Sequence, residues 1–293
     1  MSCRGRFAPS PTGILHFGSL VAAVASLAQA RSQGGEWLVR MEDLDRAREI
    51  PGAARAILAT LRALGLEWDG PVLYQRERTA AYAAALERLR ALGHLYPCGC
   101  SRREIAAAGR PGCEGPVYPG TCRDGLPPGR TARALRLRTP PGPIRFCDLV
   151  QGEQTQEVSG AVGDIVLRRA DGLHAYQLAV VVDDAWQGID QVVRGADLLL
   201  STPRQILLQR LLGLPTPSYA HIPLALDPDG RKLSKSLASA PVDPADPLPA
   251  LQRAWDWLGQ IPAPRRSTVA GFWTHAIAHW RIERVPRVAS APA

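Results

Sequence analysis

The sequence predicts an α/β protein with a doubly wound parallel sheet, because strand-like segments alternate with segments whose apolar residues recur at the helical period. Residues 4–7 have the pattern of a short strand, and two prolines in residues 8–13 exclude a helix there. Apolar residues then recur at helical spacing from Ser19 to about Ser32. In an open parallel sheet, ligands bind beyond the carboxyl ends of the strands, so the turn between this strand and this helix is a candidate site.

The alternation continues through residues 1–96, the first half of the predicted sheet domain. The pair Gly34-Gly35 ends the first helix, and residues 37–41 are predicted to form the second strand. One helix follows with Pro51 near its start, and another covers about 78–92, with Gly93 closing it. Residues 97–143 break the alternation because they are rich in glycine, proline, arginine and cysteine, and we expect an inserted module there.

The second half of the sheet domain is expected in residues 144–240. Strand patterns return at residues 164–168 and at 178–182, and residues 203–212 are predicted to be helical. Asp183 and Asp184 follow the strand predicted at 178–182; they fit either a metal pair or a cap of the next turn, and we assign them no role. Residues 241–293 begin with a linker and are expected to form a short helical region, with helices near 248–258 and 269–280 and a flexible end.

The composition is that of a soluble globular protein, with 293 residues of which 46% are hydrophobic and 21% charged. No apolar run is long enough to span a membrane and no signal peptide is visible, so we expect a cytoplasmic protein without a membrane partner. The net charge of +8 favours a polyanionic partner such as nucleic acid. Six cysteines in a cytoplasmic chain argue against a disulfide framework.

The two lysines of the chain, Lys232 and Lys235, both lie in the string Arg231-Lys232-Leu233-Ser234-Lys235-Ser236. Every other basic side chain is an arginine, 33 of the 35 Lys and Arg. An ammonium group is a compact and mobile point charge, which suits a polyphosphate whose negative charge moves during a reaction. The pair therefore predicts a phosphate-binding loop, the alternative being two solvated surface lysines.

The segment from Pro9 to Ser19 joins the first strand to the first helix and carries candidate nucleotide contacts. His16 offers a donor to a phosphate oxygen, and Gly18 lets the backbone approach a nucleotide closely. Ser19 is predicted to cap the helix and to contact a phosphate. Taken alone, a histidine in such a turn is more often structural than functional.

Together the motifs His16-Phe17-Gly18-Ser19 and Lys232-Leu233-Ser234-Lys235-Ser236 resemble the two signature motifs of class I aminoacyl-tRNA synthetases. Three further segments, 6–13, 40–45 and 182–198, are similar to the glutamyl-tRNA synthetase branch, so the resemblance runs from about 6 to 236. It implies a Rossmann-like catalytic domain, an inserted zinc-binding module, and ATP with Mg²⁺ and L-glutamate as ligands.

The implied reaction joins the carboxylate of glutamate to the α-phosphate of ATP and releases pyrophosphate. Lys235, supported by Lys232 and His16, is expected to stabilise the charge that builds up in the transition state. No protein base is needed because the nucleophile is already a carboxylate. The residues expected to contact ATP are His16, Gly18, Ser19, Lys232 and Lys235.

Glutamate carries a second carboxylate, which a desolvated site is expected to meet with arginine. Arg6, at the end of the first strand, and Arg194, after an apolar run, are the candidates. Glu42 is expected to hold the α-ammonium group, and Tyr176 to supply a hydroxyl to the same ligand. The glutamate site that the resemblance implies consists of Arg6, Ala8, Ser10, Glu42, Tyr176 and Arg194.

A structural zinc site is predicted in the inserted module from Cys98, Cys100 and Cys122. A Cys-x-Cys pair with another thiolate further along the chain fits a closed tetrahedral site. Chemistry alone favours Cys113 as the fourth ligand, because thiolate is the commoner donor. The resemblance instead implies Tyr118, and we expect Tyr118.

Two features depart from the glutamyl-tRNA synthetase pattern. Ser19 stands where the first signature usually has a second histidine, and 57 residues follow Ser236 (293 minus 236), too few for a domain that reads the anticodon. With the zinc module, these features resemble the glutamyl-Q tRNA(Asp) synthetase family. That resemblance implies activation of glutamate without tRNA and its transfer to queuosine in the anticodon of tRNA(Asp), by an enzyme expected to be a monomer.

Three alternatives remain open. The chain could be a truncated synthetase that charges tRNA(Glu) at its 3′ end, or a ligase that transfers glutamate to another acceptor. It could also be an inactive paralogue that only binds RNA. The presence of His16, Gly18 and both lysines argues against an inactive site.

Overall fold

The computed structural model describes residues 3–227, 242–264 and 268–292. Its first part is a three-stranded parallel sheet in the order β1-β2-β3, formed by β1 (Arg4–Phe7), β2 (Glu36–Met41) and β3 (Leu73–Tyr74). Helix α1 (Phe17–Ser32) connects β1 to β2 and buries most of its side chains, as the sequence predicts. Helix α2 (Ala53–Ala63) and helix α3 (Thr79–Ala91) flank β3 in sequence, close to their predicted bounds.

A second sheet has the strand order β11-β12-β8-β9 and continues the first. Its strands are β8 (Pro143–Asp148), β9 (Gly152–Glu157), β11 (Gln191–Gly195) and β12 (Ser218–Ile222). Hydrogen bonds connect Arg4 in β1 to Asp190 just before β11: the Arg4 amide donates to the Asp190 carboxylate at 2.8 Å, and the Asp190 amide donates to the Arg4 carbonyl at 3.2 Å. The α/β class is thus confirmed, with β9 added in antiparallel orientation.

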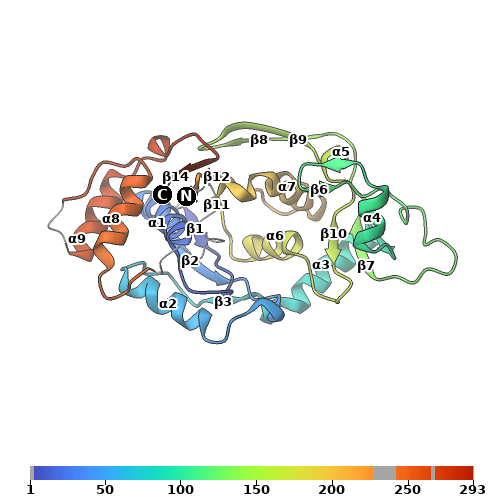
Figure 1. Cartoon of the computed structure of the whole chain (residues 1–293), viewed down its shortest axis with the longest axis horizontal. Coiled ribbons are helices and arrows are strands. Elements are labelled where there is room, and N and C mark those ends of the chain that lie inside the picture. The colour runs from blue at the N-terminus through green and yellow to red at the C-terminus, as the bar shows by residue number, and fades with distance from the viewer. Residues whose placement is uncertain (1–2, 228–241, 265–267, 293) are drawn as a thin grey trace.

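Helices α6 (Tyr176–Trp186) and α7 (Thr202–Leu212) lie between the sheets and the far end of the molecule (Figure 1). The strand predicted at 178–182 is wrong, because these residues form the middle of α6. Nearly every side chain from Leu178 to Asp184 is buried. A helix surrounded by protein loses the polar stripe that marks a helical period, so a short apolar run does not distinguish it from a buried strand.

At one end of the molecule lies a small antiparallel sheet in the order β10-β7-β4, with the exposed helix α4 beside it (Figure 1). The strands are β4 (Leu95–Cys98), β7 (Ala134–Leu137) and β10 (Val166–Arg168), so the strand predicted at 164–168 belongs here rather than to the parallel sheet. Helix α4 (Arg102–Ala108) begins with a capping box between Ser101 and Glu104. Other short elements here are β5 (Pro111–Gly112), β6 (Gly115–Pro116) and α5 (Val158–Ala161).

The opposite end is formed by α8 (Pro247–Trp257) and α9 (Val269–His279), which match the predicted helices and extend the core around α1. The indole N–H of Trp280 donates to Gln29 in α1 at 2.5 Å, and that of Trp273 donates to the Leu64 carbonyl at 2.8 Å. Strand β14 (Ser290–Pro292) pairs in parallel with β13 (Leu224–Leu226). Among the described helices, none has the length and apolar character needed to cross a membrane.

Candidate active site

A cavity of about 700 Å³ opens where β1, β2 and β11 end. Its wall contains every described residue for which we predicted a role in binding glutamate or ATP: Arg6, Ala8, Ser10, His16, Gly18, Ser19, Glu42, Tyr176 and Arg194. These residues come from segments as distant in sequence as β1 and β11, and the parallel arrangement brings their strand ends to one edge. Lys232 and Lys235 lie outside the described residues.

The first signature segment forms the start of α1. His16 is the N-cap: its Nδ1 accepts from the Ser19 amide at 3.3 Å, so the prediction that Ser19 caps the helix is wrong. An imidazole whose Nδ1 accepts carries its proton on Nε2, and Nε2 lies 3.0 Å from the Ser19 hydroxyl. A Cβ added to Gly18 would lie 3.5 Å from the His16 ring, so a side chain here would lie against the capping histidine at the cavity wall.

A buried ion network, which we call the floor of the cavity, lies directly behind Arg6 and Glu42 in the cavity wall. The Asp184 carboxylate accepts from Arg40 at 2.7 Å and from Arg6 at 3.2 Å, and Arg40 also lies 3.8 Å from Glu42. Burial alone would raise the pKa of Asp184, but the two arginines outweigh it and hold this pKa below the usual value. The balance is reversed at Glu42, where burial raises the pKa to about 7 despite Arg40 and Arg6.

Arg194 is 5% exposed and is held by neutral groups. Its Nε donates to His221 Nε2 at 3.0 Å, one Nη donates to the Thr202 hydroxyl at 2.9 Å, and the other lies 3.4 Å from the Tyr176 hydroxyl. In the part of the chain that the structure describes, no carboxylate lies within ion-pair distance of this guanidinium. Because an unpaired buried charge is unfavourable, the arrangement suits an anionic ligand at Arg194.

Asp183 and Asp184, for which we predicted no role, lie on α6, and each carboxylate accepts hydrogen bonds from other side chains. Asp183 accepts from Gln75 at 3.0 Å, from Arg78 at 3.1 Å and from the Tyr82 hydroxyl at 2.6 Å. The two carboxylates therefore serve separate networks, one that joins α3 to α6 and one that orients the arginines at the cavity floor.

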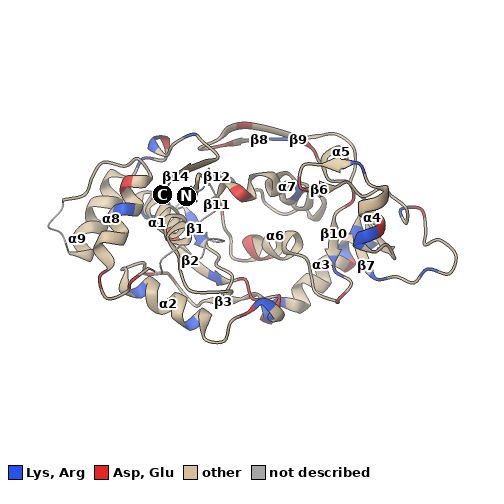
Figure 2. Ribbon diagram, viewed as in Figure 1, with Lys and Arg blue, Asp and Glu red and all other residues tan. Residues whose placement is uncertain are grey.

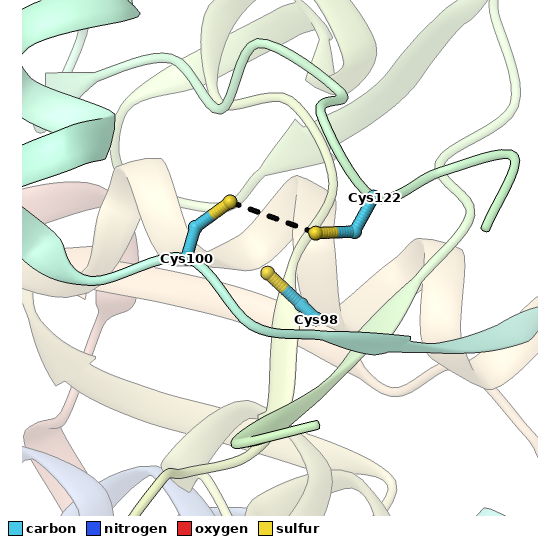
Figure 3. Close-up of side chains that lie close together, drawn as sticks. All are labelled: Cys98, Cys100 and Cys122. Carbon is cyan, nitrogen blue, oxygen red and sulfur yellow. Dashed lines mark hydrogen bonds between the residues drawn. The ribbon is translucent and has the colours of Figure 1, made fainter. Parts of the chain in front are cut away.

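The predicted zinc ligands form a second cluster beside the small antiparallel sheet, at the end of β4, and Figure 3 shows the three cysteines. Cys98, Cys100 and Cys122 have their sulfur atoms within 4.8 Å of one another, and Figure 3 shows the three thiols directed to a common point. The Tyr118 hydroxyl lies 3.4 Å from the Cys98 sulfur and 3.7 Å from that of Cys100. Cys113 is exposed, and its thiol lies instead against the Ala161 carbonyl at 3.6 Å.

The spacing of this cluster fits the size of a tetrahedral zinc site. Zinc–sulfur bonds of about 2.3 Å at tetrahedral angles place sulfur atoms about 3.8 Å apart. The sulfur atoms of Cys100 and Cys122 are 3.6 Å apart. Positive charge is also at hand, since Arg136 donates to the Cys98 sulfur at 3.3 Å and Arg130 to the Cys100 sulfur at 3.6 Å.

Basic side chains are more abundant near this cluster than their acidic counterparts. Figure 2 shows basic residues on α4, where Arg102 and Arg103 are exposed. Exposed arginines are the groups that contact phosphates of nucleic acid, so this end of the molecule suits a polyanion.

Sequence analysis missed the residues that hold the site together from behind. Arg40, Asp148, Asp184 and His221 are buried and contact the cavity residues or each other. Arg40 and Asp184 lie in segments of the resemblance but were given no role, and Asp148 and His221 belong to no pattern. The one available signal was that Arg40 and Glu42 flank the end of a predicted strand, which places two opposite charges at a strand terminus.

Comparison with known proteins places this geometry in a family. The sequence profile of the catalytic domain of class I tRNA synthetases (E and Q) matches residues 2–245. A glutamyl-Q tRNA(Asp) synthetase of Dechloromonas aromatica is 59% identical over 97% of this chain and 96% of the relative. Another, of Pseudomonas aeruginosa, is 54% identical over 98% of this chain and 97% of the relative.

Solved structures show the same fold. The crystal structure of a glutamate tRNA ligase from Elizabethkingia meningosepticum, in complex with its amino acid, aligns with a TM-score of 0.82. The alignment covers 100% of this chain and 67% of the ligase at 24% sequence identity. The chain therefore shares the architecture of about two thirds of the length of that ligase.

Proposed function

The chain belongs to the class I tRNA synthetase catalytic-domain family and, within it, to the glutamyl-Q tRNA(Asp) synthetases. We therefore propose that it activates L-glutamate with ATP and transfers the glutamyl group to queuosine in tRNA(Asp). The chain is then a ligase of the aminoacyl-tRNA synthetase type. The observation that carries the choice of glutamate is the buried Arg194 guanidinium, which faces the cavity and has no carboxylate partner among the described residues.

We propose that the side-chain carboxylate of glutamate binds between Arg194 and Arg6, with the Tyr176 hydroxyl as a further donor. Arg194 has five N–H donors, and three of them contact neutral protein groups, so two are left for a carboxylate. Glu42, across the cavity floor, then accepts the α-ammonium group. Ala8 and Ser10 line the same wall and are proposed to bound the pocket on the side of β1.

The proposed first step is attack of the α-carboxylate of glutamate on the α-phosphorus of ATP. A carboxylate–phosphate bond forms while the bond to the pyrophosphate oxygen breaks, and pyrophosphate leaves. His16 donates from Nε2 to the Ser19 hydroxyl, which keeps its own proton for a phosphate oxygen. This relay is a proposed physical use for the serine that replaces the usual second histidine. Gly18 adds a segment of wall without a side chain, and Lys232 and Lys235 are proposed to act on the departing pyrophosphate.

The second step uses a hydroxyl of the cyclopentene diol of queuosine. The hydroxyl oxygen attacks the activated carbonyl carbon, an ester bond forms, and the bond from that carbon to the phosphate oxygen breaks. AMP leaves and takes up the hydroxyl proton. The diol resembles the cis-diol of a terminal ribose, so the same cavity serves this acceptor.

We propose that Mg²⁺ enters with ATP and is held mainly by the phosphates and water. Among the described residues of the cavity wall, Glu42 and Asp197 carry carboxylates, which is too few for a dedicated magnesium cage but ordinary for a nucleotide-bound ion. Mg²⁺ supplies charge neutralisation at the phosphates.

We also propose one structural zinc ion, held by Cys98, Cys100, Tyr118 and Cys122. The support is the donor set itself: three thiols and one phenol that converge at the spacing of a tetrahedral site, with two arginines to offset the negative charge. Residues 97–143 then act as a zinc-stabilised module between the two halves of the catalytic domain, 1–96 and 144–240, with 241–293 as a helical end region. We also propose that the protein acts as a monomer in the cytoplasm, where ATP, glutamate and tRNA are found.

The test is transfer of labelled glutamate, with ATP, to tRNA(Asp) that carries queuosine and to the same tRNA without it. Label on the modified tRNA alone is the expected result. In a parallel assay with tRNA(Glu), label on its 3′ end would instead identify a truncated glutamyl-tRNA synthetase. If neither tRNA is labelled, glutamate-dependent pyrophosphate exchange without RNA separates a wrong acceptor, which leaves exchange intact, from an inactive paralogue, which abolishes it.

A further inference from the structure

Behind Arg194 lies a buried histidine–aspartate pair, His221 and Asp148, neither of which lines the cavity. His221 in β12 and Arg194 in β11 are register partners on parallel strands, and Asp148 ends the neighbouring strand β8. His221 is 0% exposed and Asp148 is 2% exposed, so neither side chain meets solvent. The pair reaches the cavity through Arg194, to which His221 is hydrogen-bonded, and His221 also lies 3.1 Å from the Thr202 hydroxyl.

The hydrogen bonds determine which ring nitrogen of His221 carries the proton. Arg194 Nε is always a donor and lies 3.0 Å from His221 Nε2, so Nε2 has to accept. The ring proton is then on Nδ1, which donates to Asp148 Oδ2 at 2.5 Å. Burial lowers the pKa of His221 and the net shift is downward, which agrees with a neutral ring.

Asp148 is fixed independently of the histidine ring. Its Oδ1 accepts from the amides of Val150 at 3.0 Å, Gln151 at 2.9 Å and His221 at 3.0 Å. Only Oδ2 therefore faces the ring, and as a carboxylate oxygen it can only accept. The Asp148 carboxylate keeps the ring proton of His221 on Nδ1. Nε2 is then free to accept from Arg194 Nε, and this hydrogen bond orients the guanidinium plane.

We propose that Asp148 and His221 are positioning residues, which orient Arg194 for the side-chain carboxylate of glutamate by holding His221 in its Nδ1-protonated tautomer. This inference rests on the proposed function for its ligand, but the tautomer itself does not. An alternative view, in which Asp148 merely modulates the local charge, makes the opposite prediction for the variant below.

The decisive variant is Asp148→Asn. The amide keeps the oxygen that accepts from the three backbone N–H groups and places an NH₂ group opposite Nδ1. The ring proton is then forced to Nε2, where it faces the Arg194 N–H and can turn only to the Thr202 hydroxyl, 3.1 Å away. The buried Nε donor of Arg194 loses its acceptor. We expect the glutamate KM in pyrophosphate exchange to rise roughly tenfold or more, with the ATP KM within about twofold of wild type. Charge modulation alone predicts a lower glutamate KM, because a negative charge near Arg194 has been removed.

A matched pair at His221 tests the same idea without touching Asp148. His221→Gln places an amide oxygen near Nε2 and can accept from Arg194 whatever residue 148 is. His221→Asn mimics only the Nδ1 donor and leaves Arg194 without an acceptor. We expect the glutamate KM to stay within about threefold for His221→Gln and to rise roughly tenfold or more for His221→Asn. Equal KM values for the two variants would overturn the proposal.

The double variant Asp148→Asn/His221→Gln supplies the rescue. Because glutamine has no tautomer, Asp148→Asn should raise the glutamate KM by less than about twofold in the His221→Gln background. A purely structural role of Asp148 instead predicts the same rise in KM in the wild-type and His221→Gln backgrounds. Nitrogen-15 NMR of the histidine rings reads the tautomer without any substrate: a protonated Nδ1 in wild type that reverses in Asp148→Asn is expected, and an unchanged Nε2-protonated ring in both would overturn the proposal. If wild-type protein shows this tautomer but no glutamate-dependent exchange, the proposed function fails while the positioning of Arg194 stands.

Discussion

Glutamate binding should depend steeply on pH because of Glu42. Burial raises the pKa of this carboxyl to about 7 from its ordinary 4.5, and the neutral acid cannot form an ion pair with the α-ammonium group. With a pKa of about 7, the ionised fraction falls about 25-fold between about pH 7.5 and about pH 5.5, whereas an ordinary glutamate would lose only about a tenth of it. Affinity for glutamate should therefore fall by roughly that factor as the pH is lowered.

The assay is isothermal titration of glutamate into the enzyme across this pH range, in buffers with different ionisation enthalpies. The substrate's own groups titrate outside the window. Near pH 7, binding should release about half a proton, because the ammonium group favours the ionised carboxylate. Glu42→Gln should bind weakly and without this pH dependence. If the wild-type affinity stays flat over the range, or if Glu42→Gln keeps the same slope, Glu42 is not the group that meets the ammonium.

Four further outcomes are expected. Glu42→Gln should raise the free energy of unfolding of the free enzyme by up to about 3 kcal/mol at pH 8 and by little at pH 4. A carboxyl with a raised pKa stabilises the folded state below its unfolded pKa near 4.5 and loses that contribution as the pH rises through about 7. Melting curves at both pH values check this. Arg194→Ala should raise the glutamate KM about a hundredfold with little change for ATP, and an unchanged KM would remove Arg194 from the pocket. Lys235→Ala should slow glutamate-dependent pyrophosphate exchange about a hundredfold, and a loss of less than about threefold would contradict its role. Tyr118→Phe should lower the zinc content measured by metal analysis, or speed zinc loss to a chelator, whereas Cys113→Ala should do neither. The reverse result would show that Cys113, and not Tyr118, is the fourth zinc ligand.

The sequence predicted the helices whose side chains are buried on one face and exposed to solvent on the other. Helices α1, α2, α3, α7, α8 and α9 have buried and exposed residues or clear ends, and their predicted bounds were correct within a few residues. Strand β9 was missed because its sequence Gly-Glu-Gln-Thr-Gln-Glu has no apolar face to mark the period. Helix α6 was mistaken for a strand for the opposite reason, since almost all of it is buried.

The walls of the candidate site were predictable because they belong to contiguous motifs, whereas the supporting residues were not. Arg6, His16, Glu42 and Arg194 each lie at a strand end or a helix start, and the sheet topology brings such positions together. Asp148 and His221 are 73 residues apart and carry no common spacing, so only the register of β8, β12 and β11 joins them to Arg194. The role of a buried polar side chain depends on its partner, and the partner is set by the fold.

The charges at the floor of the cavity favour glutamate as the substrate independently of any motif. Three buried guanidiniums, on Arg6, Arg40 and Arg194, lie near two carboxylates, on Asp184 and Glu42, which leaves one positive charge when Glu42 is ionised. The Asp148 carboxylate is not counted because the ring of His221 separates it from Arg194. Glutamate has two carboxylates and one ammonium group and brings one negative charge, so its binding neutralises the floor. A neutral amino acid such as glutamine would leave a buried guanidinium uncompensated, which is the costly state for a charge out of water. Because Arg6 and Arg40 already share Asp184, the uncompensated charge is that of Arg194, and this is where the second carboxylate has to bind.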